Sequence, residues 1–180
     1  MESEASTVFH IRPAQLSDVG DIQGLIYDLA VYEKDPESAK ATPELLRQNL
    51  FESPYAHALL AFTGTVETPG EAVGLALYFF NYSTWTGRPG IYLEDLFVKP
   101  PYRNSGIGKA FFSELGKIAE EKKCARMDWV VLKWNQPSID FYEKKLGATT
   151  MSEWVGMRLN EDGIVRLRNL DTTRQGGTSV

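Results

Sequence analysis

The order of apolar and polar residues predicts alternating helices and strands along most of the chain. Residues 8–12 form a short predicted strand that ends at Pro13, which has no N–H to donate to a central ladder. The helix that follows is predicted to be capped by Ser17 or Asp18 and to end near Pro36. Its apolar residues fall at i, i+3, i+4, i+7 and i+10, which is one helix face: Ile22, Leu25, Ile26, Leu29 and Tyr32.

A second helix is predicted to begin at Thr42, a capping hydroxyl that is followed by Pro43 at the first helical position. Three leucines supply its buried face: Leu45, Leu46 and Leu50. Turns rich in glycine and proline then separate three predicted strands, which are residues 57–62, 72–82 and 91–99.

The third of these strands carries Glu94 and Asp95 among apolar residues. Strict alternation places Leu93, Asp95 and Phe97 on one face and puts on the other Tyr92, Glu94, Leu96 and Val98. A carboxylate inside an apolar strand is unfavourable unless it has a use. The pair is therefore a candidate for chemistry.

The second half of the chain alternates again. A helix is predicted from Gly106 to Lys123, followed by a strand at 127–132, a helix at 137–146 that Gly147 ends, a strand at 151–159 and a helix at 161–170. Antiparallel strands followed by strands joined through helices indicate an α/β fold with a mixed sheet. We expect one domain over residues 8–170, a flexible tail at 1–7 and a disordered tail at 171–180.

Composition narrows the class of protein. Among 180 residues, 24 acidic and 19 basic side chains give a net charge of −5, which argues against a nucleic-acid binder and favours cationic partners. The longest apolar run, residues 72–80, is too short for a bilayer span, so we expect no membrane partner. The polar, acidic start predicts a cytoplasmic protein. Cys124 is the only cysteine, and no cluster has the spacing of a metal site, so no metal is expected.

The most specific local motif is Arg103-x-x-Gly106-x-Gly108, between a strand and a helix start. Two glycines allow close approach of the backbone to a ligand, and the amides of a helix N-terminus favour phosphate oxygens. The motif matches neither a P-loop nor a dinucleotide fingerprint. Spacing alone leaves an ordinary glycine turn equally open.

A second motif begins at Asn135, which can cap the helix that carries Tyr142. By itself, a tyrosine on a short helix indicates core packing. Together, in this order and after the Glu94-Asp95 strand, the two motifs resemble those of the GNAT superfamily of acetyl-CoA-dependent N-acetyltransferases. Further matches, such as Leu29-Ala-x-Tyr32-Glu33, are similar to the spermidine/spermine and thialysine N-acetyltransferases.

The resemblance implies a single-domain GNAT-like fold with a twisted, mixed sheet of about six to seven strands flanked by helices, in which the fourth and fifth strands splay apart around the thioester. It also implies a homodimer, in some relatives with the last strand contributed across the interface, here residues 151–159. The residues implied to bind acetyl-CoA are Leu96, Phe97, Val98, Arg103, Asn104, Ser105, Gly106, Ile107, Gly108, Lys109, Asn135, Pro137, Ser138 and Tyr142.

The chemistry of amine acetylation agrees with two of these positions. An alkylammonium must lose a proton before its nitrogen attacks, and Glu94 is the candidate base, directly or through water. Tyr142 is the candidate proton donor to the departing thiolate, because a phenol is protonated at neutral pH. Cys124 lies outside both motifs, so we expect direct transfer in a ternary complex without an acyl-enzyme.

The amine side is expected to be acidic and aromatic. The candidates are Tyr32, Glu33, Trp85, Glu94, Asp95, Asp128 and Trp129. An additional residue in 144–147 and the segment 152–158 depart from the spermidine/spermine type. Three hypotheses therefore stay open: an acetyltransferase for a small cationic amine, one for a protein lysine or N-terminus, and a non-catalytic acyl-CoA-binding module.

Overall fold

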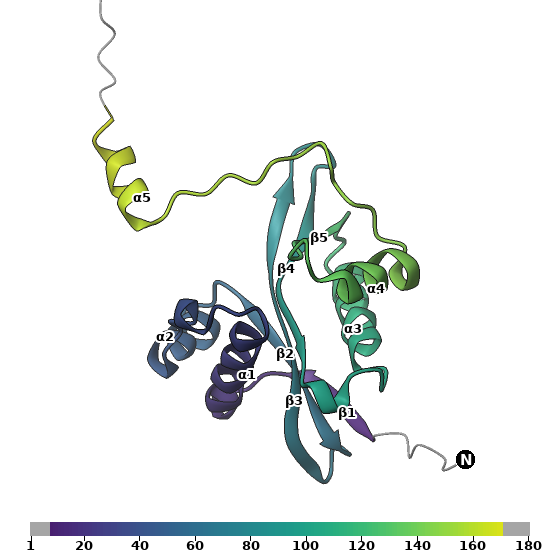
Figure 1. Ribbon diagram of the computed structural model, residues 1–180. Helices are drawn as coiled ribbons and strands as arrows, with labels where there is room; N and C mark the ends of the chain where they lie inside the picture. The colour runs from purple at the N-terminus through teal and green to yellow at the C-terminus, as the bar shows by residue number, and fades with distance from the viewer. Residues whose placement is uncertain (1–7, 171–180) are drawn as a thin grey trace, which may run out of the picture. The chain divides into compact units, whose positions relative to one another are not determined.

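The computed structural model describes residues 8–170 (Figure 1). The chain forms two compact units, the first ending at Val130 and the second beginning at Val131. The first unit contains one five-stranded sheet in the order β1-β2-β3-β4-β5. The strands are β1 (Phe9–Pro13), β2 (His57–Gly64), β3 (Pro69–Ser83), β4 (Arg88–Val98) and β5 (Met127–Trp129). The helices of this unit are α1 (Val19–Tyr32), α2 (Pro43–Arg47) and α3 (Ile107–Glu121), and those of the second unit are α4 (Gln136–Leu146) and α5 (Glu161–Arg168).

The sheet is mixed, as the sequence predicts. The first four strands pair antiparallel, and β5 pairs parallel with β4 after the crossover through α3. The predicted count of six to seven strands is wrong. Residues 151–159 form no strand, because a strand needs a neighbour to share its backbone hydrogen bonds and no described segment pairs with them. The predicted strand at 127–132 is also shorter and ends at Trp129.

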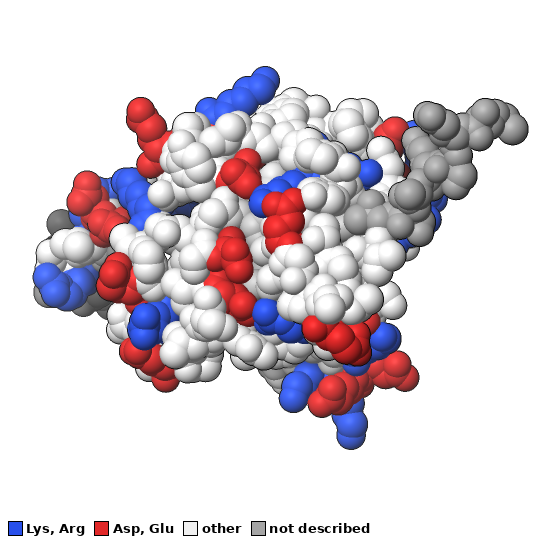
Figure 2. All heavy atoms as spheres, turned by 90° about the horizontal axis from the view of Figure 1, so that it is seen from below, with Lys and Arg blue, Asp and Glu red and all other residues white. Residues whose placement is uncertain are grey.

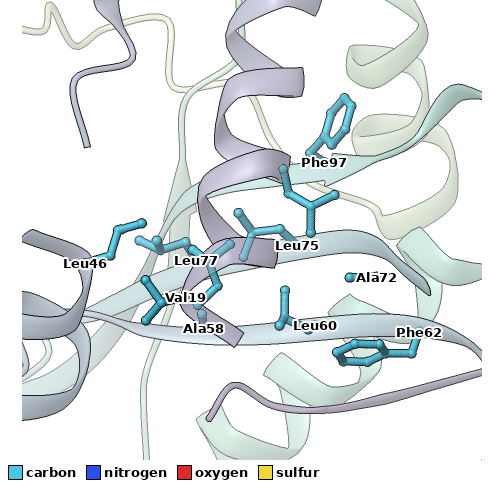
Figure 3. Packing of buried hydrophobic residues seen from close by; sticks show 11 residues of the cluster. Val19, Leu46, Ala58, Leu60, Phe62, Ala72, Leu75, Leu77 and Phe97 are labelled. Carbon is cyan, nitrogen blue, oxygen red and sulfur yellow. The ribbon is translucent and has the colours of Figure 1, made fainter. Parts of the chain in front are cut away.

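Two apolar layers cover the two sides of the sheet. The α1-face cluster lies between α1, α2 and the strands, as Figure 3 shows. Its buried members are Val19, Ile22, Leu25, Leu46, Ala58, Leu60, Phe62, Ala72, Leu75, Leu77 and Phe97. The α3-face cluster joins the other side of the sheet to α3 through Leu59, Ala61, Val73, Ala76, Tyr78, Ile91, Leu93, Ile107, Phe111 and Leu115.

The predicted face of α1 is confirmed. Ile22 and Leu25 are fully buried, and Tyr32 and the other predicted residues pack partly buried against the same cluster. The capping prediction is wrong in its chemistry, because the Asp18 side chain does not cap α1. Its carboxylate instead accepts from the Arg12 guanidinium at 2.6 and 2.9 Å, and this pairing lowers the pKa of Asp18. The ion pair therefore joins the end of β1 to the start of α1.

The predicted cap of α2 is confirmed, since the Thr42 hydroxyl accepts from the Leu45 amide at 3.3 Å. Its predicted buried face is only partly correct. Leu46 is buried and Leu50 packs partly buried against the α1-face cluster, but Leu45 is 47% exposed. Leu45 and Leu46 are adjacent and point about 100° apart, and only Leu46 lies toward the cluster. The α-helix ends at Arg47, and the chain continues as a π-helix over Gln48–Glu52, which carries Leu50.

Charged side chains of both signs are interspersed on the face seen in Figure 2, without a continuous basic area. Within residues 8–170, no helix is long and apolar enough to span a membrane. In the same range, no group of three or more His, Cys, Asp or Glu side chains could hold a metal ion.

Candidate active site

A β-bulge interrupts β4 at the two carboxylates. Leu93 lies opposite Tyr78 of β3, and Asp95 lies opposite Leu77, so Glu94 is an additional residue without a partner in the register. A bulge adds twist and changes which face the following side chains occupy. It therefore explains how Glu94, which is exposed, leaves the regular ladder.

The bulge overturns the predicted alternation. Leu93 belongs to the α3-face cluster and Phe97 to the α1-face cluster, although strict alternation places them together. Leu96 and Val98 pack with Leu93 against the α3 side. Alternation fails because one residue of β4 is not counted in the pairing with β3.

The two sides of β4 differ beyond this point. The parallel pairing with β5 covers only Ile91, Tyr92 and Leu93, whose last partner is Trp129. From Glu94 to Val98, β4 is paired with β3 alone among the described strands. The main chain around Phe97 therefore lies along an unpaired strand edge, whose N–H and C=O groups suit an extended amide-bearing ligand.

The glycine turn follows directly. Asn104 and Gly106 both have left-handed backbones, with φ of 64° and 96°, and the Ser105 hydroxyl donates to the Tyr102 carbonyl at 2.6 Å. Gly106 immediately precedes α3 and has no side chain that could accept hydrogen bonds from the first amides of that helix. Because the first amides of a helix lack intrahelical partners, this turn is suited to phosphate oxygens.

Arg103 of this turn reaches the end of α1. Its guanidinium lies 4.4 Å from the ring centroid of Tyr32 and 5.7 Å from that of Phe97. Its Nε donates to the Val98 carbonyl at 3.0 Å. A residue expected at the coenzyme is thus in contact with one expected at the amine, and the contact is a cation–π interaction.

Asp95 lies close to two other carboxylates, Glu94 and Glu33, at this end of α1. Burial, and after it the charges of Glu94 and Glu33, raise the pKa of Asp95 from 3.8 to about 6. Burial also raises the pKa of Glu33. Each shift reports an environment in which negative charge is unfavourable, so a nearby ammonium group would stabilise the ionised forms. We refer to Glu33, Glu94 and Asp95 as the acidic group.

The other predicted amine residues lie elsewhere in the first unit. Trp85 is 87% exposed in the turn between β3 and β4, at the other end of the strand from the acidic group. Trp129 packs edge-on against Phe112 of α3, with ring centroids 5.3 Å apart. Asp128 is paired with Arg126 at 2.9 Å. Tyr32 therefore directly precedes Glu33 of the acidic group, and Trp85 lies far from it. Trp129 lies in register with Leu93, next to the bulge, but its ring packs on the α3 side.

The second unit carries the second motif on a well-capped helix. The buried Asn135 accepts from the Ser138 amide at 3.4 Å, Pro137 occupies the first turn of α4, and Gly147 ends the helix with φ of 73°. These features confirm the predicted helix. Tyr142 lies in that helix, with its ring 5.6 Å from that of Phe141. Its proximity to Glu94, a residue of the first unit, stays a prediction.

Sequence reasoning missed Asn81 and Arg126, which both contact Asp128. The Asn81 amide nitrogen donates to the Asp128 carboxylate at 3.4 Å, and Arg126 binds the same oxygen. The spacing Arg126-x-Asp128 was an available signal, because residues two apart share a face of a strand. No local pattern marked Asn81, because β3 and β5 are far apart in the sequence and their side chains come together only in the folded sheet.

Known proteins resemble this chain in sequence and in fold. Residues 24–148 match the model of the Acetyltransferase (GNAT) family. The chain is 43% identical to thialysine N-epsilon-acetyltransferase of Bos taurus over 152 residues, which cover 81% of this chain and 87% of that protein. It is 34% identical to the human spermidine/spermine N(1)-acetyltransferase-like protein 1 over 88% of this chain and 23% of that protein. Its fold resembles that of an integron cassette protein from the mobile metagenome of V. cholerae, with TM-score 0.73, 24% identity and coverage of 90% and 98%.

Proposed function

Because the chain belongs to the Acetyltransferase (GNAT) family, we propose that it transfers an acetyl group from acetyl-CoA to a primary amine of a small cationic substrate. Candidate substrates are a lysine-like amino acid, a diamine or a polyamine. The observation that carries this proposal is the acidic group at the bulge, beside the unpaired edge of β4. Negative charge at that point favours an alkylammonium over a neutral or anionic acceptor.

Acetyl-CoA would supply the acetyl group as an activated thioester. The unpaired edge of Leu96, Phe97 and Val98 would hold its amide-bearing arm, and the amides of the glycine turn would hold its pyrophosphate. Asn135, Pro137 and Ser138 of the second unit are proposed to line the other side. Gly106 supports this assignment. Its left-handed conformation favours a glycine, and a glycine leaves that part of the turn without a side chain.

The reaction forms one bond and breaks one. The amine nitrogen forms a bond to the acetyl carbonyl carbon, and the carbon–sulfur bond breaks. Glu94 accepts the proton that the amine loses, directly or through water, and the Tyr142 phenol donates a proton to the sulfur. Transfer is direct in a ternary complex, which is consistent with the position of Cys124 between α3 and β5, outside both motifs.

Among the acceptors, the relatives favour small amines. The relative from Bos taurus is named for thialysine, a lysine-like amino acid, and the human relative for spermidine and spermine. The raised pKa values of Asp95 and Glu33 support the same class, because a flexible cation with more than one amine would meet several carboxylates.

A CoA-release assay tests the proposal. The purified protein is given acetyl-CoA with thialysine, lysine, cadaverine, putrescine, spermidine or a basic peptide. We expect CoA release with at least one of the small amines. Activity on the peptide alone would replace the proposal with a protein acetyltransferase. Tight acetyl-CoA binding without release by any amine would indicate a non-catalytic acyl-CoA-binding module.

Replacing Tyr142 with Phe tests the proposed proton donor. The change should lower kcat by roughly 10²-fold or more while acetyl-CoA affinity changes little, because only the phenolic proton is lost. Tyr55→Phe is the matched control, since Tyr55 is 81% exposed. Unchanged turnover in Tyr142→Phe would remove this residue from the mechanism.

A homodimer and a cytoplasmic location stay predictions. The exposed apolar residues around 151–159, such as Val155 at 81% and Met157 at 90%, support contact with a second copy, because such side chains gain by burial. Light scattering during size exclusion measures the mass directly. A monomer at micromolar concentration would contradict the dimer.

A further inference from the structure

A polar network lies on the α1 side of the sheet. It is nearer to the C-terminal end of β3 than Leu77, the residue that pairs with Asp95 of the acidic group. Leu77, Phe79 and Asn81 are alternate residues of β3, and the pairing with β4 is regular between Tyr78 and Ser83. Because Leu77 belongs to the α1-face cluster, alternation places Phe79 and Asn81 on the same side.

β5 contributes the charged part of this network. Asp128 lies in register with Tyr92 and faces away from Trp129, which packs against α3. Its Oδ2 atom binds the Arg126 Nε at 2.9 Å and the Asn81 amide nitrogen at 3.4 Å. We refer to Asn81, Arg126 and Asp128 as the polar network.

The absence of a side chain at Gly90 leaves space for this network. Gly90 lies opposite Asn81, and a Cβ atom there would collide with the Asn81 Oδ1 atom and lie 3.1 Å from the Arg126 Cγ atom. The Asn81 Oδ1 atom is buried and has no donor among the described residues. An unsatisfied buried acceptor lowers stability, so its presence favours a role other than stability.

An aromatic pair lies beside Asp128, because Asp128 is in register with Tyr92. The rings of Phe79 and Tyr92 stack with centroids 5.0 Å apart and planes at 27°. Phe79 stands between Asn81 and Leu77, and Leu77 is opposite Asp95. An interval of two residues is roughly 7 Å of strand. Asp128, which is level with Phe79, therefore lies about the length of an extended lysine side chain from the level of Asp95 along the strand direction.

We propose that Asn81, Arg126 and Asp128 form a subsite for the amino-acid head group of a lysine-like substrate, whose side-chain amine reaches Glu94 and Asp95. This inference rests on the proposed function. Arg126 has further N–H groups beyond Nε, and a guanidinium pairs well with a carboxylate. Asp128, whose carboxylate accepts from the Asn81 amide nitrogen, suits the α-ammonium group. The aromatic pair provides an apolar surface for the methylene chain.

The subsite distinguishes amino acids from polyamines. A lysine-like head group carries one positive and one negative charge, which match the opposite charges of Asp128 and Arg126. A diamine presents an ammonium group without the carboxylate, so Arg126 has no favourable partner in it. Specificity then arises from a group that is left unpaired with the wrong substrate.

Substrate pairs that differ only in a carboxylate test this inference. Lysine is compared with cadaverine, and thialysine with its decarboxylated analogue. Arg126→Gln should lower kcat/KM for both amino acids by roughly 10–100-fold, mainly through KM, because one charge-assisted pairing is lost. It should leave the two diamines unchanged within about 3-fold. Asp128→Asn should weaken all four substrates, since each carries a second ammonium group.

The controls separate this inference from the proposed function. Lys117→Gln removes a cation from α3, on the other side of the sheet, and should change neither substrate pair. Calorimetry measures lysine affinity for the CoA complex of wild type and Arg126→Gln. Equal affinity, or no lysine binding to wild type, would overturn the subsite. Binding that depends on Arg126 without turnover of any amine would overturn only the proposed function.

Discussion

The two halves of β4 belong to one strand but differ in their neighbours. Ile91, Tyr92 and Leu93 pair with β5, so this part of the strand has a neighbouring strand on each side. Ile91 and Leu93 are almost completely buried. After the bulge at Glu94, the same strand has β3 on one side only, and it carries the two carboxylates. The first half is built for stability, whereas the second presents backbone and charge to a ligand.

The comparison shows what a bulge contributes. A single additional residue frees Glu94 from the ladder and turns Asp95 to the α1 side, where Glu33 lies close enough to raise its pKa. Irregular pairing next to functional residues is a recurring use of bulges. The positions of Glu94 and Asp95 thus follow from the end of regular pairing, and substitutions on both sides of the bulge can test the difference between the two halves.

The largest expected effect is that of Glu94→Gln. Loss of the proton acceptor should lower kcat by roughly 10²–10⁴-fold while the thermal midpoint stays close to that of wild type. Glu114→Gln, on α3, is the matched control, because it removes a similar carboxylate that pairs with Lys117 at 2.7 Å. CoA release at saturating amine measures the effect. Full activity in Glu94→Gln would exclude this residue as the base.

Stability should respond most in the first half of the strand. Ile91 is 0% exposed, and Ile91→Ala should lower the free energy of unfolding by about 2–5 kcal/mol through a new cavity. Leu96 is only partly buried, so Leu96→Ala should lower it by about 1 kcal/mol. Urea denaturation of both variants provides the values. Equal losses would mean that the second half is as firmly packed as the first.

The glycine turn beyond the second half should be sensitive to backbone strain. A Cβ at Gly106 meets nothing within 4 Å, so Gly106→Ala acts through φ of 96° alone. It should destabilise the fold by about 1–2 kcal/mol and raise the KM for acetyl-CoA. Gly116→Ala also meets nothing within 4 Å, but it lies inside α3 and should stabilise by about 0.5–1 kcal/mol. Urea denaturation of the two variants should therefore give changes of opposite sign in the free energy of unfolding, and changes of the same sign would contradict the prediction.

The smallest effect concerns pH. The pKa of Asp95 is raised from 3.8 to about 6, so the folded state holds this proton more tightly than the unfolded chain. Stability should therefore fall as pH rises through that window, and above it the cost of the ionised form is fully present. Asp95→Asn should remove this slope. Urea denaturation on both sides of the window measures it, and parallel curves for the two proteins would contradict the assigned pKa.

Much of the fold follows from local signals in the sequence. The spacing of Ile22 and Leu25 determines the buried face of α1, and Thr42 with Pro43 determines the start of α2. The glycine turn is equally local, since the conformation of Gly106 is one that other residues rarely adopt. Such features can be predicted because the residues that decide them are neighbours in the chain.

The remaining features depend on distant partners. The face of Leu93 could not be predicted, because the bulge is defined by pairing with β3. The segment 151–159 has the composition of a strand, but composition supplies no neighbour to pair with. In the candidate site, the residues came from motifs, whereas the contact of Arg103 with Tyr32 required the folded chain.

The Arg103–Tyr32 contact has a thermodynamic consequence. One side chain belongs to the turn proposed for the coenzyme, and the other lies beside Glu33 at the end of α1. A ligand that changes this contact at one end changes the free energy of binding at the other. Linkage requires the two effects to be equal, so any gain in amine affinity from bound acetyl-CoA must be matched by the same gain in acetyl-CoA affinity from bound amine.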